Sequence, residues 1–321
     1  MIILAWNETS YVRMLAFIIY LLLKKTSTLV SSLLAVITVT FFLMHSIPGS
    51  PFADDKLDAE ISKALATHYG LDQPLWLQYV KYLKNICVFD LGPSLHYQGR
   101  AVKDVIINGF PTSFVLGLEA MTLAILAGIG LGLVSAANHL KWQDCVSMLF
   151  ATFCMSLPSF ILATLLQFVF AMKLDLLPVA RWGSFAQSIM PALSLAALPT
   201  AFIARLTRVN LIEAMQQDYI LTARAKGLGQ MQIIYKHALR NAIFPVLSYL
   251  APLSANIFIG SFAVERIFAI PGLGHSFVQS IINRDYSMIM GLTIFYSCIL
   301  LLAVWLIDTI YLFLDPRLKD R

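Results

Sequence analysis

The sequence predicts an all-α integral membrane protein with six transmembrane helices and a small helical insertion outside the membrane. Three observations lead to this fold class. The 321-residue chain is 59% hydrophobic, against roughly 45–50% in soluble globular domains. Only 13% of its residues are charged. Several apolar stretches reach the roughly 20 residues that a helix needs to cross the hydrocarbon core of a bilayer.

Six apolar stretches have the length of a transmembrane helix. They cover residues 28–47, 112–137, 144–172, 188–209, 242–263 and 288–314. A shorter apolar run at 14–23 is too brief to span by itself, and it ends at Lys24 and Lys25. This run predicts an interfacial helix that leads into the first span, or part of a signal-like region. A cleaved signal is disfavoured because no small-residue cleavage site follows.

The spans divide the chain into five parts. These are an N-terminal cytoplasmic or interfacial segment (1–27), the first span (28–47), an extracytoplasmic insertion (48–110), a five-helix transmembrane unit (111–315) and a cytoplasmic tail (316–321). In the insertion, apolar residues at helical spacing between Leu75 and Ile86 predict a helix. Pro74 lies at its start, where the missing N–H costs nothing.

The distribution of Lys and Arg predicts that both ends of the chain lie in the cytoplasm. With that orientation, inside segments hold 13 of the 23 basic residues. The short outside loops keep only Lys173, Arg181, Arg266 and Arg284. The basic residues of the insertion are discounted because long loops translocate largely regardless of their charge.

Composition and motifs argue against several functional classes. No basic patch interleaved with aromatic residues accompanies the net charge of +5, which argues against nucleic-acid binding. The histidines and cysteines show no ligand spacing, so no metal site is predicted. No GxSxG, HExxH or GxxxxGK[ST] motif occurs, so the sequence predicts neither catalytic residues nor an ATPase site. The glycines of "GIGLGLV" (128–134) lie inside a span and predict close helix packing.

One short segment concentrates charge in a chain that otherwise avoids it. The segment "TARAKGLGQMQIIYKHALRNAIFPV" (222–246) contains Arg224, Lys226, Lys236, His237 and Arg240. A short amphipathic helix, opened by Gly227, is predicted from the apolar residues Leu228, Met231, Tyr235, Ala238, Leu239 and Ala242. From the residues alone, this helix is either a solvated loop near anionic headgroups or a surface helix held by another protein.

The motifs around this segment resemble the permeases of ABC importers, most closely the first permease subunit of oligopeptide and dipeptide transporters. The matching motifs are "PGSPF" (48–52), "YGLDQPL" (69–75), "FDLGPSL" (89–95), "FPTSF" (110–114), "SLPSF" (156–160), "MPALSLA" (190–196), "ARLTR" (204–208), "IPGLGHSFVQSIINRDY" (270–286) and "DPR" (315–317). Each is weak by itself, but their order and spacing are specific. The resemblance implies a type I ABC importer transmembrane fold in a bacterial cytoplasmic (inner) membrane.

In the resembling family, the basic segment belongs to a coupling loop that binds in a cleft of a cytoplasmic ATPase subunit. The resemblance therefore implies a coupling loop at residues 209–242. Its implied contact residues are Thr222, Ala223, Ala225, Lys226, Gly227, Leu228, Met231, Tyr235, His237 and Arg240. Leu221 stands where the importer consensus has glutamate, and Pro245 comes late, and both departures resemble the peptide subgroup. Residues 1–13 precede the point at which chains of the family usually begin.

The resemblance also implies an outer gate and a docking surface for a binding protein after the fifth span. The residues assigned to it are Glu265, Pro271, Gly272, Gly274, Asp285 and Tyr286. An ordinary tight connector is the alternative for this segment.

Glu119, inside the second span, must face protein or water, because burial in lipid costs several kcal/mol. It is either a pathway residue or a structural hydrogen-bonding partner, and Asp308 in the sixth span is given a structural role.

The sequence thus predicts a permease subunit of an ATP-driven peptide importer. The implied partners are a second homologous permease, two ATPase subunits, an extracytoplasmic substrate-binding protein and membrane lipid. The chain itself is expected to bind no cofactor, because ATP and Mg are used by the partner subunits. A secondary transporter is the main alternative and would need inverted repeats and intramembrane charges; an intramembrane enzyme lacks a catalytic constellation. Dipeptides, longer peptides, nickel chelates and glutathione all remain open as substrates.

Overall fold

The computed structural model describes the backbone of residues 8–47, 67, 70, 72–96, 99–258 and 260–314. Helices form nearly all of its regular structure, which confirms the all-α class. In chain order they are α1 (Glu8–Ser46), α3 (Leu75–Cys87), α4 (Val102–Ala137), α5 (Trp142–Ser156), α6 (Ser159–Leu166), η1 (Gln167–Lys173), α7 (Phe185–Met215), α8 (Asp218–Ala225), α9 (Gln230–Gln232), η2 (Ile233–Ala238), α10 (Leu239–Phe258), α11 (Phe262–Ile267), α12 (Leu273–Ile282) and α13 (Tyr286–Leu314). Most of residues 48–71 and the side chain of Asp308 lie outside the described residues.

The first helix is longer than a transmembrane span. α1 contains 39 residues and extends about 58 Å at 1.5 Å per residue, against a hydrocarbon core of about 30 Å. It runs without interruption through Lys24 and Lys25. The run 14–23 therefore leads into the first predicted span as one continuous helix, and its interfacial place stays a prediction.

The third predicted span, residues 144–172, is broken in two. α5 ends at Ser156, and the helix that starts at Ser159 is bent from it by 102°. Leu157 has an extended backbone and Pro158 is the N-cap of α6. Proline lacks an N–H and disfavours a helical conformation in the residue before it, so the helix ends here. The predicted third span thus consists of two helices joined at a sharp bend, and its crossing of the membrane as one span stays a prediction.

In the part of the chain that the structure describes, four other segments are long and apolar enough to cross a membrane by length and composition. They are Leu23–Ser46, Val102–Ala137, Phe185–Met215 and Tyr286–Leu306. The predicted fifth span, 242–263, corresponds to α10, which contains Pro245 and Pro252 and ends at Phe258. The helix predicted between Leu75 and Ile86 is confirmed as α3, with Pro74 at its N-cap, and its extracytoplasmic place stays a prediction.

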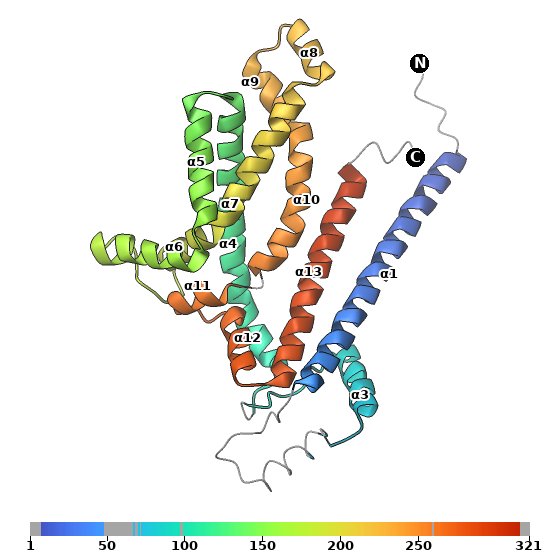
Figure 1. Cartoon of the computed structure of the whole chain (residues 1–321). Helices are drawn as coiled ribbons and strands as arrows, with labels where there is room; N and C mark the ends of the chain where they lie inside the picture. Colours follow the sequence, from blue (N-terminus) through green and yellow to red (C-terminus); the bar gives the residue numbers. More distant parts are fainter. Residues whose placement is uncertain are drawn as a thin grey trace.

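Helices α4 and α7 pack closely at the centre of the molecule (Figure 1). Gly128 and Gly132 of α4 lie against α7. A Cβ atom on Gly128 would approach Ile203 Cβ to 2.7 Å, and one on Gly132 would approach Thr207 Cβ to 2.5 Å. These glycines permit the close approach of the two backbones, which confirms the interpretation of "GIGLGLV" as a packing motif.

The helices form an elongated bundle with two distinct ends (Figure 1). We call the end that carries α8 and α9 the coupling end, and the opposite end the α12 end. The N-terminal part of α1 and the C-terminal part of α13 lie on the side of the coupling end, whereas α3 and α12 lie at the α12 end. The two predicted functional segments are therefore at opposite ends of the molecule.

Candidate functional site

The coupling loop consists of a short helix, a glycine turn and the beginning of a long helix. The short helix is α8, which precedes Gly227. After Gly229 the chain is helical through α9 and η2 and continues directly into α10. The helix predicted after Gly227 is present from Gln230, but it is not short. The helix that begins after the turn continues to Phe258, because its first residues are the beginning of the fifth apolar helix.

Gly227 closes α8 with a Schellman motif. Its N–H donates to Arg224 O at 2.9 Å, and the Leu228 N–H donates to Ala223 O at 3.3 Å. Gly227 has a φ of +76°, the left-handed conformation that glycine adopts at low cost. A Cβ atom here would meet nothing within 4 Å. The requirement for glycine is therefore conformational and not a matter of space.

A buried apolar cluster holds the coupling loop against α4 and α7. Its loop members are Ile220, Ala223, Ile233, Ile234, Ala238 and Ala242, which pack with Leu211 and Ala214 at the end of α7. Partly buried residues of α4, Leu133, Ala136 and Ala137, pack against the same cluster. The loop is thus anchored to the two central helices.

The apolar residues that were predicted to share one face of the loop helix instead lie on two sides of it, one buried and one exposed. Ala238 and Ala242 are buried, whereas Met231 is 65% exposed and Tyr235 is 55% exposed. Residues 233–238 form a π-helix, whose wider turn shifts the angular position of the residues on either side of it. The 3.6-residue pattern used for the prediction therefore does not hold across this segment.

Most of the predicted contact residues lie on the outer surface of the loop. Exposed members are Thr222, Ala225, Lys226, Gly227, Met231, Tyr235 and Arg240; Leu228 and His237 are half-buried, and Ala223 is buried. Arg224 and Leu221 are also exposed and, with Met215, line a groove of about 410 Å³ beside α7. The loop therefore presents apolar and cationic side chains together on a rigidly packed base.

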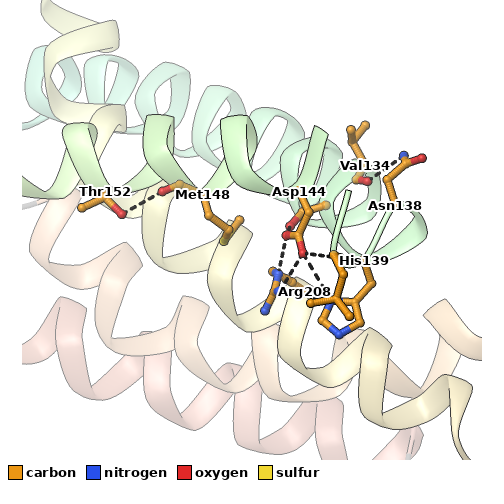
Figure 2. A network of polar contacts seen from close by, with 9 residues as sticks. Val134, Asn138, His139, Asp144, Met148, Thr152 and Arg208 are labelled. Atoms are coloured by element: carbon orange, nitrogen blue, oxygen red, sulfur yellow. Dashed lines mark hydrogen bonds and ion pairs between the residues drawn. The ribbon is translucent and has the colours of Figure 1, made fainter. Parts of the chain in front are cut away.

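An ion pair that was not predicted fixes the α4–α5 turn to α7 at the coupling end (Figure 2). Arg208 contacts Asp144 through two bonds, Nε to Oδ1 at 2.7 Å and Nη2 to Oδ2 at 2.8 Å. The Leu140 N–H donates to Oδ2 at 3.1 Å, and the Ser135 hydroxyl donates to Oδ1. His139 Nδ1 lies 3.2 Å from Oδ2. Asp144 is buried and fully surrounded by donors.

The sequence signal for this pair is weak. Asp144 marked the start of a predicted span, and Arg208 counted as a cytoplasmic charge within "ARLTR". The two residues are 64 positions apart, and no local pattern pairs residues at that separation. The helix of Arg208, α7, leads directly to the coupling loop, so the pair connects that loop to the α4–α5 turn.

At the α12 end, Glu265 is completely buried in α11. Its Oε1 accepts a bond from the Ser113 hydroxyl at 2.7 Å, and its Oε2 accepts one from the His275 N–H at 3.1 Å. The Leu273 N–H donates to Ser113 Oγ at 2.9 Å. The carboxyl group therefore caps the start of α12 and joins it to α4. Burial raises the pKa of Glu265, and its hydrogen bonds partly oppose this effect.

The glycines around Glu265 make room for its carboxyl group. A Cβ atom on Gly272 would approach Glu265 Cδ to 2.4 Å, and one on Gly274 would approach Oε2 to 3.0 Å. Gly260 has a φ of +88°, and its Cβ would lie 2.2 Å from Oε1. Side chains larger than hydrogen at these positions displace the carboxyl group.

Asp285 forms a second buried junction at this end. Its Oδ1 accepts bonds from the backbone N–H groups of Leu95 and Met288, each at 3.1 Å, and the Ser94 hydroxyl donates to Oδ2. Asp285 thus caps α13 and ties the segment before α4 to it. The adjacent Tyr286 is also buried.

The predicted docking residues are therefore mostly inside the molecule. Of the six, only Pro271 is exposed, whereas Glu265, Gly272, Gly274, Asp285 and Tyr286 are buried. Direct contact of the five buried residues with a binding protein is incompatible with this arrangement, because other parts of the chain cover them. They order the backbone of the segment, and its role as an outer gate stays a prediction.

Glu119 lies in α4, on an apolar groove of about 490 Å³ between α4 and α7. Its Oε2 is buried and has no hydrogen-bond partner among the described residues. The nearby Thr122 hydroxyl donates to Leu118 O at 2.8 Å. The alternative role of Glu119, as a structural hydrogen-bonding partner, requires a bond to its carboxyl group. The described residues provide none to Oε2. Its role as a pathway residue stays a prediction.

Within the described ranges, no group of three or more His, Cys, Asp or Glu side chains is arranged to hold a metal ion. The titratable clusters at both ends instead consist of carboxylates with hydrogen-bond donors. The arrangement provides a rigid bundle with a contact surface at the coupling end.

Comparison with protein families and known proteins finds consistent matches. The profile described as "Binding-protein-dependent transport system inner membrane component" matches residues 128–320, and the profile of the N-terminal part of such components matches residues 14–117. The dipeptide transport system permease protein DppB of Bacillus subtilis is 46% identical over 93% of this chain and 97% of its own length. The oligopeptide transport system permease protein OppB of Haemophilus influenzae is 38% identical over 95% of this chain and 100% of its own length.

A solved structure shares the fold. It is described as "Crystal structure of an amino acid ABC transporter with histidines" and matches with a TM-score of 0.51 at 18% sequence identity. The match covers 64% of this chain and 92% of that chain. At this identity, the likeness concerns the arrangement of the helices alone.

Proposed function

This chain belongs to the family of binding-protein-dependent transport system inner membrane components, and we propose that it is the permease subunit of an ATP-driven peptide importer. It forms half of a translocation pathway and transmits movement between cytoplasmic ATPase subunits and the membrane. The substrate class follows from the curated relatives, which are named as dipeptide and oligopeptide permeases.

The observation that carries the coupling role is the exposed surface of the coupling loop. Met231 and Tyr235 are more than half exposed, although Ile233 and Ile234 between them are buried against α7 and α4. Large apolar side chains on a rigid base fit a groove of a partner, and neighbouring cations such as Lys226 favour one orientation of the contact. The partner supplies the ATP and Mg site.

The remaining subunits follow from this role. A second homologous permease completes the pathway, two ATPase subunits bind the two coupling loops, and an extracytoplasmic binding protein delivers the substrate at the α12 end. The coupling end faces the cytoplasm of a bacterium, and the N-terminal part of α1 and the C-terminal part of α13 lie on that side. The alternative, an ATP-independent secondary transporter, does not need an exposed loop with apolar and basic side chains, because it has no ATPase partner to bind.

Movement of the bundle requires a difference in contacts between two states. ATP shifts the balance between inward-open and outward-open states only through contacts that differ in the two. The coupling loop is anchored to both α4 and α7, so a displacement of the loop moves both central helices. Rigid anchoring is therefore the structural basis proposed for alternating access.

The test replaces Met231 with glutamate in the full complex reconstituted in vesicles with labelled dipeptides and longer peptides. Met231→Glu is expected to reduce ATP-dependent uptake at least tenfold, because a carboxylate placed in an apolar groove loses its hydration without a partner. Leu140→Glu is the matched control, because Leu140 is also exposed at the same end but lies outside the loop. Normal uptake by Met231→Glu contradicts the coupling role, and failure of every labelled peptide to enter contradicts the substrate class.

A further inference from the structure

A groove of about 380 Å³ lies between α1 and α13, toward the coupling end. α1 contributes Lys24, Thr28 and Ser32 to its lining, and α13 contributes Leu301, Val304 and Trp305. The coupling loop and the α12 end, which serve the proposed transport cycle, lie elsewhere. The groove combines a polar wall with an apolar wall.

The polar wall is a stripe along one face of α1. Lys24, Thr28 and Ser32 are four residues apart in succession, so they lie above one another on the helix surface. Lys24 is exposed, and the Thr28 hydroxyl donates to Lys24 O at 3.0 Å. Lys25 also lines the groove and has a further interaction within the chain, so we assign the contact with a bound ligand to Lys24.

The apolar wall contains an unsatisfied donor. Trp305 Nε1 is buried and has no hydrogen-bond partner in the described part of the chain. The indole N–H is only a donor, and leaving it buried without an acceptor costs roughly 1–3 kcal/mol. An acceptor bound in the groove removes this cost. Leu301 and Val304, on the same face of α13, offer no polar group.

The position of the groove along α1 matches the edge of a membrane. Lys24 and Lys25 stand between the apolar run 14–23 and the first predicted span, 28–47, so Lys24 lies just before the residues expected to enter the hydrocarbon core, at the depth of the headgroups. Trp and Lys residues are typical of this depth. The flanking sequence holds Lys24, Lys25 and one acid, Asp308, one turn beyond Trp305, which leaves the local charge positive.

We propose that this groove binds an anionic phospholipid of the leaflet on the coupling side. The headgroup phosphate lies between the Lys24 ammonium and the Trp305 indole N–H, and an acyl chain follows Leu301 and Val304. Basic pockets between transmembrane helices on the cytoplasmic side recognise anionic headgroups in this way. The choice of leaflet rests on the proposed function, because that function places the coupling end in the cytoplasm. The lipid contacts themselves do not depend on transport.

The experiment measures lipid retained by the purified complex in native mass spectrometry. The complex is taken from vesicles that contain phosphatidylcholine with a quarter of phosphatidylglycerol. Wild-type chain is expected to retain phosphatidylglycerol in preference to phosphatidylcholine. Lys24→Gln is expected to reduce this preference about fivefold, the effect of one basic residue near an anionic headgroup. Trp305→Phe, which keeps an aromatic ring but removes the N–H, is expected to reduce it by a similar factor.

Lys141→Gln is the matched control, because Lys141 is exposed at the coupling end but does not line the groove. Equal retention of the two lipids by wild-type chain overturns the proposal, as does an unchanged preference in both groove variants. Displacement of phosphatidylglycerol by excess inorganic phosphate also overturns it, because the acyl chain is then irrelevant. The readout is binding, so it stands even where the complex transports no peptide.

Discussion

Both ends of the bundle are organised around buried carboxylates, but their partners differ. At the coupling end, Asp144 is paired with the guanidinium of Arg208. At the α12 end, the donors to Glu265 and Asp285 among the described residues are only hydroxyl and backbone N–H groups. The coupling end therefore uses a charge pair between two long helices, whereas the α12 end uses carboxylates as caps of the helices that follow its turns.

The two ends also differ in what they leave exposed. The coupling loop keeps its buried stripe inside and presents Met231 and Tyr235 outward. In the segment 265–286, five of the six residues singled out from the sequence are buried. The coupling end thus presents exposed side chains above a buried apolar cluster. At the α12 end, the residues of the sequence motif are themselves the buried ones.

The largest expected effect on stability tests the charge pair at the coupling end. Arg208→Leu leaves the Asp144 carboxylate buried without its cation and is expected to destabilise the chain by about 3 kcal/mol. The value is at the low end of the range for buried pairs because the Arg208 side chain is 23% exposed. The free energy of unfolding in mixed micelles measures the loss.

A double substitution separates pairing from packing. Removing both charges with Asp144→Ser and Arg208→Leu is expected to cost less than Arg208→Leu alone, because no charge then remains buried. A double variant that is less stable than both single variants contradicts charge pairing as the basis of this junction.

A smaller effect is expected at Glu265. Glu265→Gln keeps the shape of the side chain but replaces a carboxyl oxygen, which can accept a hydrogen bond even when protonated, with an NH2 group that only donates. This NH2 group faces either the Ser113 hydroxyl or the His275 N–H. We expect a loss of about 1–2 kcal/mol, measured by the unfolding midpoint in detergent near pH 4. Gln279→Glu is a matched control. It makes the reverse exchange of glutamine and glutamate on α12, at a position where the native chain has no buried carboxyl group. A loss as large as that of Arg208→Leu erases the distinction between the two ends.

The same variant changes the dependence of stability on pH. Burial raises the pKa of Glu265 in the folded chain, so its protonated form favours folding. Its contribution is complete below the ordinary value of 4.5 and is lost as the pH rises through the raised pKa. Wild-type chain is thus expected to lose stability over this interval relative to Glu265→Gln. A constant difference between the two across that interval contradicts the shift.

An effect as small as that at Glu265 is expected at Gly227. Gly227→Ala forces a side chain into the left-handed conformation, at a cost of roughly 1–2 kcal/mol, and Gly227→Asn is expected to cost less. Gly130→Ala is the matched control, because Gly130 also has nothing within 4 Å of its Cβ position but lies in a helix. It is expected to be stabilising by about 0.5–1 kcal/mol. Equal effects at the two positions contradict the conformational requirement.

Several features of this protein follow from the sequence because they depend on local patterns. Apolar stretches as long as the bilayer is thick predict the spanning helices at or near their observed places. Spaced glycines predict the contact of Gly128 and Gly132 with α7, because small residues on one helix face permit close approach. The break at Leu157 and Pro158 also had a local signal, but the length and apolarity of the run outweighed it in the prediction.

Other features were decided only by the tertiary structure. The pairing of Asp144 with Arg208 and the burial of Glu265 depend on which helices become neighbours, and residues far apart in the chain carry no shared local pattern. The outward direction of Met231 and Tyr235 depends on a π-helical turn that the packing of α8 and α10 accommodates. The sequence alone determined which segments are helical and where charge collects. Packing between distant helices determined which of those charges are buried, and which side chains remain free to meet a partner.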